Sequence, residues 1–310
     1  MLMRQILDVY ELLDRADASG EKMEEYLRYL GAEEVEVTTI EGPKGKTDMI
    51  RVTIPGTNGK SAGGKAPTLG VLGRLGGLGA RPEQIGFVSD GDGALVALAV
   101  AAKLLDMKSK GDQLEGDVVC CTHICPDAPT SPHKPVPFMG SPVDMATVNK
   151  HEVNGSLDAI LSIDTTKGNR IINTRGFAIS PTVKDGYILR VSEDLLDIMQ
   201  MTTGKMPYVF ALSTQDITPY GNNLFHLNSI LQPSTATEAP VVGVAITTEV
   251  PVAGCATGAT HAGDLEEAAR FVIETAKAYG RCECEFYDKE EFERIVSKYG
   301  NMKHIQTLGK

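Results

Sequence analysis

Six ionisable side chains each follow a short apolar segment of the chain. They are Asp90, Asp92, His123, Asp127, Asp164 and His261. In α/β proteins, catalytic and ligand-binding residues commonly occupy such positions. Carboxylate oxygens and imidazole nitrogens are usual protein ligands for zinc, manganese and cobalt. A bound metal polarises a carbonyl group and lowers the pKa of its bound water to about 7. The pattern therefore predicts a metal site, and hydrolysis is the natural chemistry for it.

The elements that must bring these residues together are short strands that alternate with helices. The apolar segments are "TLGVLG", "QIGFVS", "DVVCCT", "DAILSI", "MPYVFAL" and "VVGVAIT", and the helical segments include "GALVALAVAAKLLDMK" and "DLEEAARFVIETAKAYG". This alternation predicts an α/β fold with a mostly parallel mixed sheet flanked by helices. Ligands of such sheets bind beyond the carboxyl ends of the strands. The six residues are therefore expected to converge at one edge of the sheet.

The first 66 residues follow a different pattern. Apolar spacing predicts two helices, and "EEVEVTTI" followed by "DMIRVTIPG" predicts a β-hairpin. We expect a single α/β domain over residues 1–310, in which an N-terminal helical and hairpin appendage (1–66) packs on a sheet core (67–310). The sequence contains neither an internal repeat nor a convincing linker.

Each candidate residue also has a purely structural interpretation. Asp90 and Asp92 precede a helical segment and could cap it. For Asp92, capping is the preferred interpretation. For Asp90, capping and metal binding are equally favoured. His123 lies beside three cysteines and fits a buried histidine that hydrogen-bonds to the backbone. Asp164 at the end of an apolar strand and His261 in a glycine-rich loop are the better candidates for metal ligands.

Composition excludes several classes of function. The formal net charge is −11 and the lysines are scattered among acidic residues, so nucleic acid is not an expected partner. No run of 18 apolar residues occurs, and the N-terminal pattern is broken by charges every few positions. We therefore expect neither a membrane span nor a secretory signal, and a cytoplasmic protein whose cysteines are free thiols.

Two further motifs could carry chemistry. The stretch "RVTIPGTNGKSAGG" resembles the phosphate loop of ATP-dependent peptide ligases, but the glycines and the proline after Ser61 disfavour the helix that such a loop opens. A flexible, lysine-bearing hairpin or lid is the preferred interpretation of Gly56–Ser61. Cys125 lies two residues after His123 and could be a nucleophile, although buried thiols are commoner.

The order of these segments resembles the co-catalytic zinc aminopeptidases from about Thr68 to Gly280. The stretch "SDGDGALVALAVAAKLL" matches the segment with the bridging aspartate of that superfamily, which implies this role for Asp90. The stretch "LDAILSIDTTKG" matches the segment with a later aspartate ligand, Asp164. The tail "EAPVVGVAITTEVPVAGCATGATHAGDLEEAARFV" matches the segment with the last histidine ligand, His261. The resemblance implies a site for zinc, manganese or cobalt on these three residues.

The chain also departs from the pattern of that superfamily. Arg74 and Gly76 stand where His-x-Asp is expected, and "HICPD" follows "DVVCCT" where paired glutamates are expected. The full two-metal apparatus is therefore lost. His123 or Asp127 would serve as a further ligand or as the base, and Arg74 would pair with a substrate carboxylate.

Two functions from different classes follow. The first is a metal-dependent hydrolase-like protein that acts on a small amide or peptide-like substrate and has a single metal site. The alternative is a non-catalytic protein that binds a small-molecule or peptide ligand, or acts as a scaffold, on a degenerate aminopeptidase-like fold. The related peptidases are often multimers, which implies a homo-oligomer. The whole chain also resembles a bacterial and archaeal family of unknown function.

Overall fold

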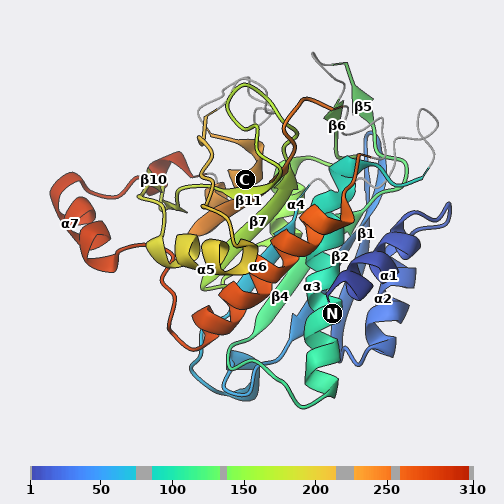
Figure 1. The fold of residues 1–310 in the computed structure, drawn as a ribbon, viewed down its shortest axis with the longest axis horizontal. Helices are drawn as coiled ribbons and strands as arrows, with labels where there is room; N and C mark the ends of the chain where they lie inside the picture. Colours follow the sequence, from blue (N-terminus) through green and yellow to red (C-terminus); the bar gives the residue numbers. More distant parts are fainter. Residues whose placement is uncertain (1, 75–85, 133–137, 214–226, 253–258, 307–310) are drawn as a thin grey trace.

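The computed structural model describes residues 2–74, 86–132, 138–213, 227–252 and 259–306. The described residues contain a sheet of nine strands flanked by helices (Figure 1). Its strand order is β1-β2-β4-β3-β7-β11-β9-β10, and β8 pairs with β11. The expected α/β architecture with a mixed, mostly parallel centre is confirmed.

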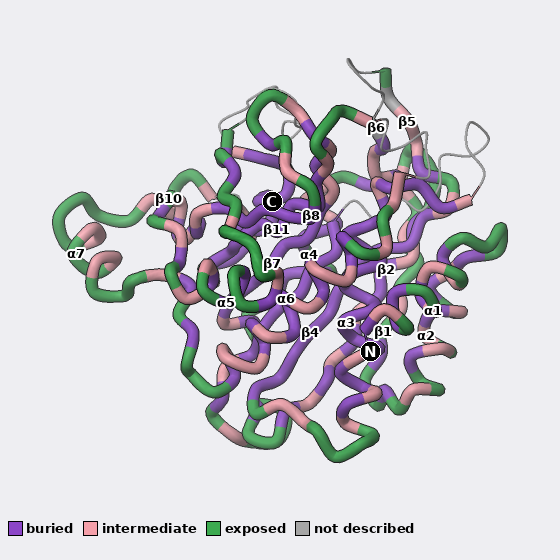
Figure 2. Tube along the Cα trace, viewed as in Figure 1, coloured by how far each residue is buried: buried purple, intermediate pink, exposed green. Residues whose placement is uncertain are grey.

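Four parallel strands form the centre of this sheet, and they are β3 (Leu69–Gly73), β4 (Val118–Ile124), β7 (Ala159–Thr165) and β11 (Val241–Thr247). Almost every residue of these strands is buried, as the purple central strands of Figure 2 show. Cys120 packs in one hydrophobic core, whereas its neighbours Val119 and Cys121 pack in another. Both faces of the sheet are therefore covered, which explains why the strands are continuous apolar runs.

The N-terminal segment consists of α1 (Met3–Leu13), α2 (Gly20–Tyr29) and the hairpin β1 (Glu34–Gly42) and β2 (Gly45–Ile54). The two expected helices and the hairpin are thus present. The hairpin also extends the main sheet, because β2 pairs antiparallel with β4 from Asp48 opposite Ile124 to Ile54 opposite Val118. Helix α1 packs on α3, and α2 packs on β1 (Figure 1).

Helix α3 (Asp92–Ser109) begins against the carboxyl ends of the central strands. A Cβ atom on Gly73 would lie 2.6 Å from the carbonyl oxygen of Gly93, and a Cβ atom on Gly93 would lie 2.5 Å from the carbonyl oxygen of Ile163. Only glycine permits this approach of helix and strand. The helix N-terminus, with its partial positive charge, therefore lies at the edge where β3 and β7 end.

The remaining elements lie around this core. The helices are α4 (Met145–Glu152), α5 (Glu193–Thr203), α6 (Ala262–Gly280) and α7 (Lys289–Tyr299). The short strands are β5 (Thr130–Ser131), β6 (Phe138–Met139), β8 (Gly176–Ile179), β9 (Val183–Lys184) and β10 (Tyr187–Ile188). The 3-10 helices are η1 (Lys60–Ala62), η2 (Ser89–Gly91), η3 (Ser229–Thr235) and η4 (Lys303–Ile305). Across the described ranges, no helix has the length and apolarity needed to cross a membrane.

Two segments that the sequence predicts to be strands do not form regular strands in the structure. In "QIGFVS", the described residues 86–88 are irregular, because Phe87 stacks edge-on against Tyr10 of α1 and its amide donates to Asp14. In "MPYVFAL", only an isolated bridge forms, between Val209 and Ile179. Both segments have the apolar content of strands, but tertiary packing gives them other partners.

Candidate functional site

Three predicted residues lie at the carboxyl ends of the central strands. Arg74 directly follows β3, and its backbone amide donates to the carbonyl oxygen of Ile163 at 2.7 Å, next to Asp164 of β7. The hydroxyl group of Thr165 donates to the carbonyl oxygen of Ser89 at 2.8 Å. This bond joins the end of β7 to η2, the short helix that contains Asp90. The structure therefore brings Arg74, Asp90 and Asp164 to one edge of the sheet.

Asp90 and Asp164 are two poorly compensated carboxylates at this edge. Burial raises the pKa of Asp164 well above its usual value, and the negative charge of Asp90 raises it further. Burial also raises the pKa of Asp90 to about 6. Within the described residues each carboxylate accepts one hydrogen bond, from the amide of Thr165 at 2.7 Å and from that of Met139 at 3.4 Å. A proton or a cation between them would relieve this charge.

Asp92 does not cap α3. The N-cap residue is Gly91, which makes no side-chain capping bond, and Asp92 is the first residue of the helix. Its side chain is fully buried and accepts hydrogen bonds from Lys167 Nζ at 3.2 Å and from the hydroxyl group of Thr260 at 2.7 Å. The preferred interpretation from the sequence is corrected, because Asp92 is half of a buried ion pair.

Arg74 is buried in an internal ion pair. Its Nη1 atom donates to Glu152 and, at 3.1 Å, to Asn149, both on α4, while Nη2 lies 3.4 Å from Gln232 of η3. Arg74 is 1% exposed and Glu152 is fully buried. The sequence pattern did not identify Glu152 and Asn149 as partners of Arg74. Its only signal was their spacing of three residues, which places both on one face of a helix. A role of Arg74 toward a substrate carboxylate remains a prediction.

The two residues proposed as base occupy contrasting environments. His123 is 1% exposed, and its Nδ1 atom lies 3.0 Å from the hydroxyl group of Thr47. Burial, with the positive charge of Arg74, lowers the pKa of His123 to about 3. The imidazole is therefore neutral near pH 7, which is the form of a base or a ligand. Asp127 is exposed, on the segment that follows β4.

His261 is the most exposed of the three predicted metal ligands. It is the N-cap residue of α6, its side chain is exposed, and it makes no capping bond. The loop that carries it nevertheless contacts the start of α3, because the neighbouring Thr260 donates to Asp92. In the part of the chain that the structure describes, no three His, Cys, Asp or Glu side chains group as a metal site would require. Joint binding of a metal by Asp90, Asp164 and His261 therefore stays a prediction.

Asp90 and Asp164 are linked through charge, and carboxylate oxygens are ligands that suit a hard cation. Magnesium is bound through one or two carboxylates, with water or substrate as the other ligands, and manganese takes similar oxygen ligands. Zinc in proteins usually has three or four ligands, rich in nitrogen and sulfur. Among the three expected metals, oxygen ligands such as these carboxylates favour manganese.

The loop that resembles a phosphate loop lies at the opposite edge of the sheet, where β4 and β7 begin. The carboxylate of Asp117 accepts hydrogen bonds from the amides of Gly56 and Ser61, each at 2.8 Å, and from the hydroxyl group of Ser61 at 2.7 Å. Lys60 Nζ forms an ion pair with Asp158 at 2.7 Å. The segment Gly56–Ser61 is therefore held around an internal carboxylate, so the structure gives no support to the flexible hairpin or lid that the sequence favoured.

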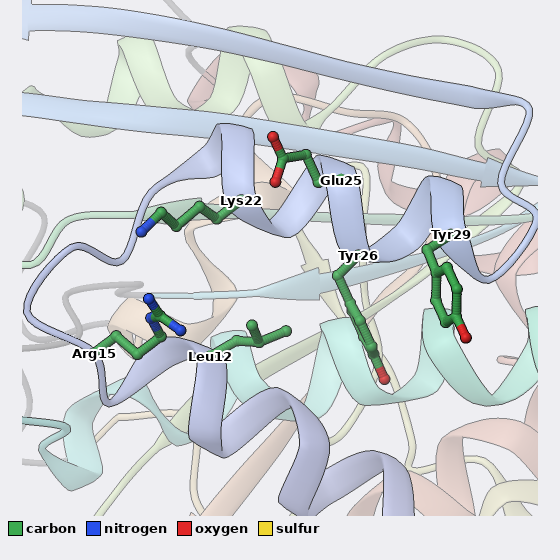
Figure 3. Close-up of a pocket in the computed structure, with 6 residues that line it drawn as sticks. All are labelled: Leu12, Arg15, Lys22, Glu25, Tyr26 and Tyr29. Carbon is green, nitrogen blue, oxygen red and sulfur yellow. The ribbon is translucent and has the colours of Figure 1, made fainter.

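A second surface feature is a depression of about 370 Å³ between α1 and α2 (Figure 3). Its lining comes from these helices and the turn between them, and consists of Leu12, Arg15, Lys22, Glu25, Tyr26 and Tyr29. The depression is open, and Arg15 and Lys22 both form ion pairs with Asp17. Its basic side chains are thus already paired, and it takes no part in the strand-end site.

Comparison with known proteins agrees with this architecture. A family model described as "Protein of unknown function (DUF1177)" matches residues 38–309. The crystal structure of the LapA aminopeptidase of Legionella pneumophila superposes with a TM-score of 0.52 at 10% sequence identity, over 92% of this chain and 72% of that one. At this identity the likeness shows only that the fold is similar to the fold of this aminopeptidase. No curated protein sequence matches the chain.

Proposed function

The chain belongs to the DUF1177 family of proteins of unknown function, and we propose that it is a metal-dependent hydrolase of a small amide or peptide-like substrate, with a single metal site. The observation that carries this proposal is the pair of Asp90 and Asp164. Asp164 lies buried and Asp90 half-buried at the carboxyl edge of an aminopeptidase-like sheet, and the charge of Asp90 raises the pKa of Asp164. Such an arrangement is costly to folding and is typical of functional sites.

The proposed division of labour follows from the environment of each residue. A bound cation would polarise the substrate carbonyl group and acidify a water molecule. Asp90 and Asp164 would hold it, and the N-terminus of α3 would stabilise negative charge nearby. His261 remains the proposed third ligand, because its neighbour Thr260 already bonds to Asp92. For the base, Asp127 is accessible to solvent, whereas His123 is neutral and buried.

Arg74 has a different role in this proposal from the one that the sequence suggested. Releasing it to a substrate carboxylate would leave Glu152 as an unpaired buried charge, at a cost of about 3–5 kcal/mol. We therefore assign Arg74 to holding α4 against the end of β3, beside Asp164. The substrate carboxylate, if the substrate has one, would need another partner.

Metal analysis of protein purified without chelators tests the proposal. We expect about one equivalent of manganese, zinc or cobalt per chain, and loss of that metal in Asp164→Asn. Asp158→Asn is the matched control, because Asp158 lies at the other edge of the sheet and pairs with Lys60. Hydrolysis of aminoacyl amides and dipeptides is then measured with each metal added. A chain that binds none of these metals would contradict the proposal.

The alternative function is a non-catalytic protein that binds a small-molecule or peptide ligand. The observation that favours it is that the described residues contain no complete group of three metal ligands. Metal binding without turnover of any amide or dipeptide would support this alternative. Assembly into a homo-oligomer also remains a prediction, which light scattering of the purified chain would decide.

A further inference from the structure

The end of α5 and the segment after it expose several large apolar side chains close together. In the described ranges, four such side chains lie between residues 201 and 209, and they are Met201, Met206, Tyr208 and Val209. Their exposed fractions are 69%, 74%, 49% and 47%. Single exposed apolar residues are normal on a protein surface, whereas a close group of them marks an interaction site. We call these four residues the α5 patch.

The backbone that carries the α5 patch is held in place. The carbonyl oxygen of Thr202 accepts a hydrogen bond from Arg270 of α6 at 2.8 Å, and α5 packs along α6 (Figure 1). The amide of Ile179 in β8 donates to the carbonyl oxygen of Tyr208, and the amide of Phe210 donates to the carbonyl oxygen of Ile179, each at 3.0 Å. A partner would therefore meet a supported surface, which reduces the entropy lost on binding.

The same two bonds to β8 make Val209 a short sheet edge. They use the groups on either side of Val209, so its own amide and carbonyl groups point away from β8. An exposed apolar edge of this kind can pair with another chain. Pro207 has no amide proton, so the edge supports a short pairing and not an extended sheet.

The charge around the α5 patch is balanced. Lys205 pairs with Glu267 at 2.9 Å, and Arg270 pairs with Glu266. The whole chain carries a formal net charge of −11, which opposes contact between two copies through acidic surfaces. In a two-fold interface the same surface meets itself, and a rim with both signs of charge meets its own copy without net repulsion. The rim therefore suits a second copy of this chain.

The size of the α5 patch also fits a dimer. Each of its side chains exposes on the order of 100 Å², so the four together expose about 400 Å². A standard interface buries about 800 Å² on each partner, and a little over half of that area, about 450 Å², is non-polar. The patch and its charged rim therefore supply nearly all the apolar area that a stable dimer needs.

We propose that the α5 patch is the contact surface between two copies of this chain, related by a two-fold axis. The two Val209 edges meet near the axis, and the methionines, whose flexible side chains fill irregular gaps, pack around them. The inference goes beyond the proposed function and does not depend on it, because it uses neither Asp90 nor Asp164.

Sedimentation velocity over a range of protein concentrations tests this inference. We expect the wild type to sediment as a dimer. Met206→Glu and Tyr208→Glu each place an unpaired charge inside the contact, so each should raise the dimer Kd by about 100-fold or more. The matched control is Ile188→Glu, which places the same charge on an apolar side chain of β10 that is 57% exposed. This control should keep the Kd of the wild type.

Circular dichroism establishes that each variant is folded before it is sedimented. A monomeric wild type would overturn the inference, and so would a wild-type Kd in the folded Met206→Glu and Tyr208→Glu variants. An equal weakening in Ile188→Glu would also overturn it, because added negative charge and not the α5 patch would then govern association. None of these outcomes bears on metal binding, so this inference and the proposed function fail separately.

Discussion

The carboxylates at the two edges of the central sheet have opposite environments. At the amino edge, Asp117 and Asp158 directly precede β4 and β7, and each is surrounded by donors. At the carboxyl edge, Asp90 and Asp164 accept one hydrogen bond each within the described residues, and burial raises the pKa of both. The first pair stabilises the fold, whereas the second pair is a cost that a bound cation would offset.

The amino edge also explains why a structural loop resembles a nucleotide-binding one. A Cβ atom on Gly59 would lie 1.8 Å from a carboxylate oxygen of Asp117, so only glycine fits beside that side chain. Backbone amides that converge on an anion serve a carboxylate as well as a phosphate. Lys60, which would reach a phosphate in a nucleotide-binding loop, reaches Asp158 instead.

The largest expected effect concerns the compensated ion pair at the carboxyl edge. Arg74→Met should lower the free energy of unfolding by about 3–5 kcal/mol, because Glu152 is then a buried charge without its partner. The double variant Arg74→Met/Glu152→Met should recover most of this loss. Urea unfolding of the wild type, the single variant and the double variant measures both changes in stability. A double variant as unstable as the single one would contradict this account of the pair.

The next effect concerns the carboxylate at the amino edge. Asp117→Ala should destabilise the protein by about 2–4 kcal/mol, because it leaves the amides of Gly56 and Ser61 without their acceptor. The exposed Asp112 offers a matched control, and Asp112→Ala should change stability by less than about 0.5 kcal/mol. Equal losses in thermal unfolding of the two variants would show that the loop does not depend on Asp117.

The third effect has the opposite sign and comes from the carboxyl edge. In metal-free protein at pH 8, Asp90→Asn should raise the free energy of unfolding by about 1–2 kcal/mol, because it removes a charge whose pKa is raised to about 6. This estimate is below the full shift, since Asp90 is partly exposed. Asp158→Asn should destabilise under the same conditions. A loss of stability in both variants would contradict this prediction.

The last expected effect is a dependence of stability on pH, with the same size as the third because it has the same origin. The pKa of Asp90 is about 6 in the folded protein and near its usual value when unfolded, so the folded state takes up the proton first as the pH falls. The contribution of this group to stability therefore rises from pH 7 to pH 4, by about 1–2 kcal/mol. Subtracting the unfolding curve of Asp90→Asn from that of the metal-free wild type isolates it, and a flat difference would contradict the assignment.

The sequence predicted the fold better than the site. Continuous apolar strands alternating with helices indicated the parallel centre, because strands covered on both faces need no polar alternation. The rule that ligands bind at the carboxyl ends of strands led to Asp90 and Asp164. Glu152 and Lys167 could not be found in this way, since their importance depends on which buried charge each one meets across the fold.

The sequence also could not predict that the side chain of His261 is exposed. A glycine-rich loop before a helix predicts that a histidine is near the strand ends, but it does not fix the direction of the side chain. The loop does reach the start of α3 through Thr260, which donates to Asp92. Whether the imidazole itself joins Asp90 and Asp164 depends on a cation that would draw the three together.

The central claim is that Asp90 and Asp164 together hold one cation at the carboxyl edge of the sheet. The most direct measurement is an anomalous difference map, recorded at the manganese absorption edge, from a crystal of the chain grown with Mn²⁺. We predict one strong peak within about 2–2.5 Å of oxygen atoms of both carboxylates. A map with no peak there, or with peaks only at surface carboxylates, would contradict the account.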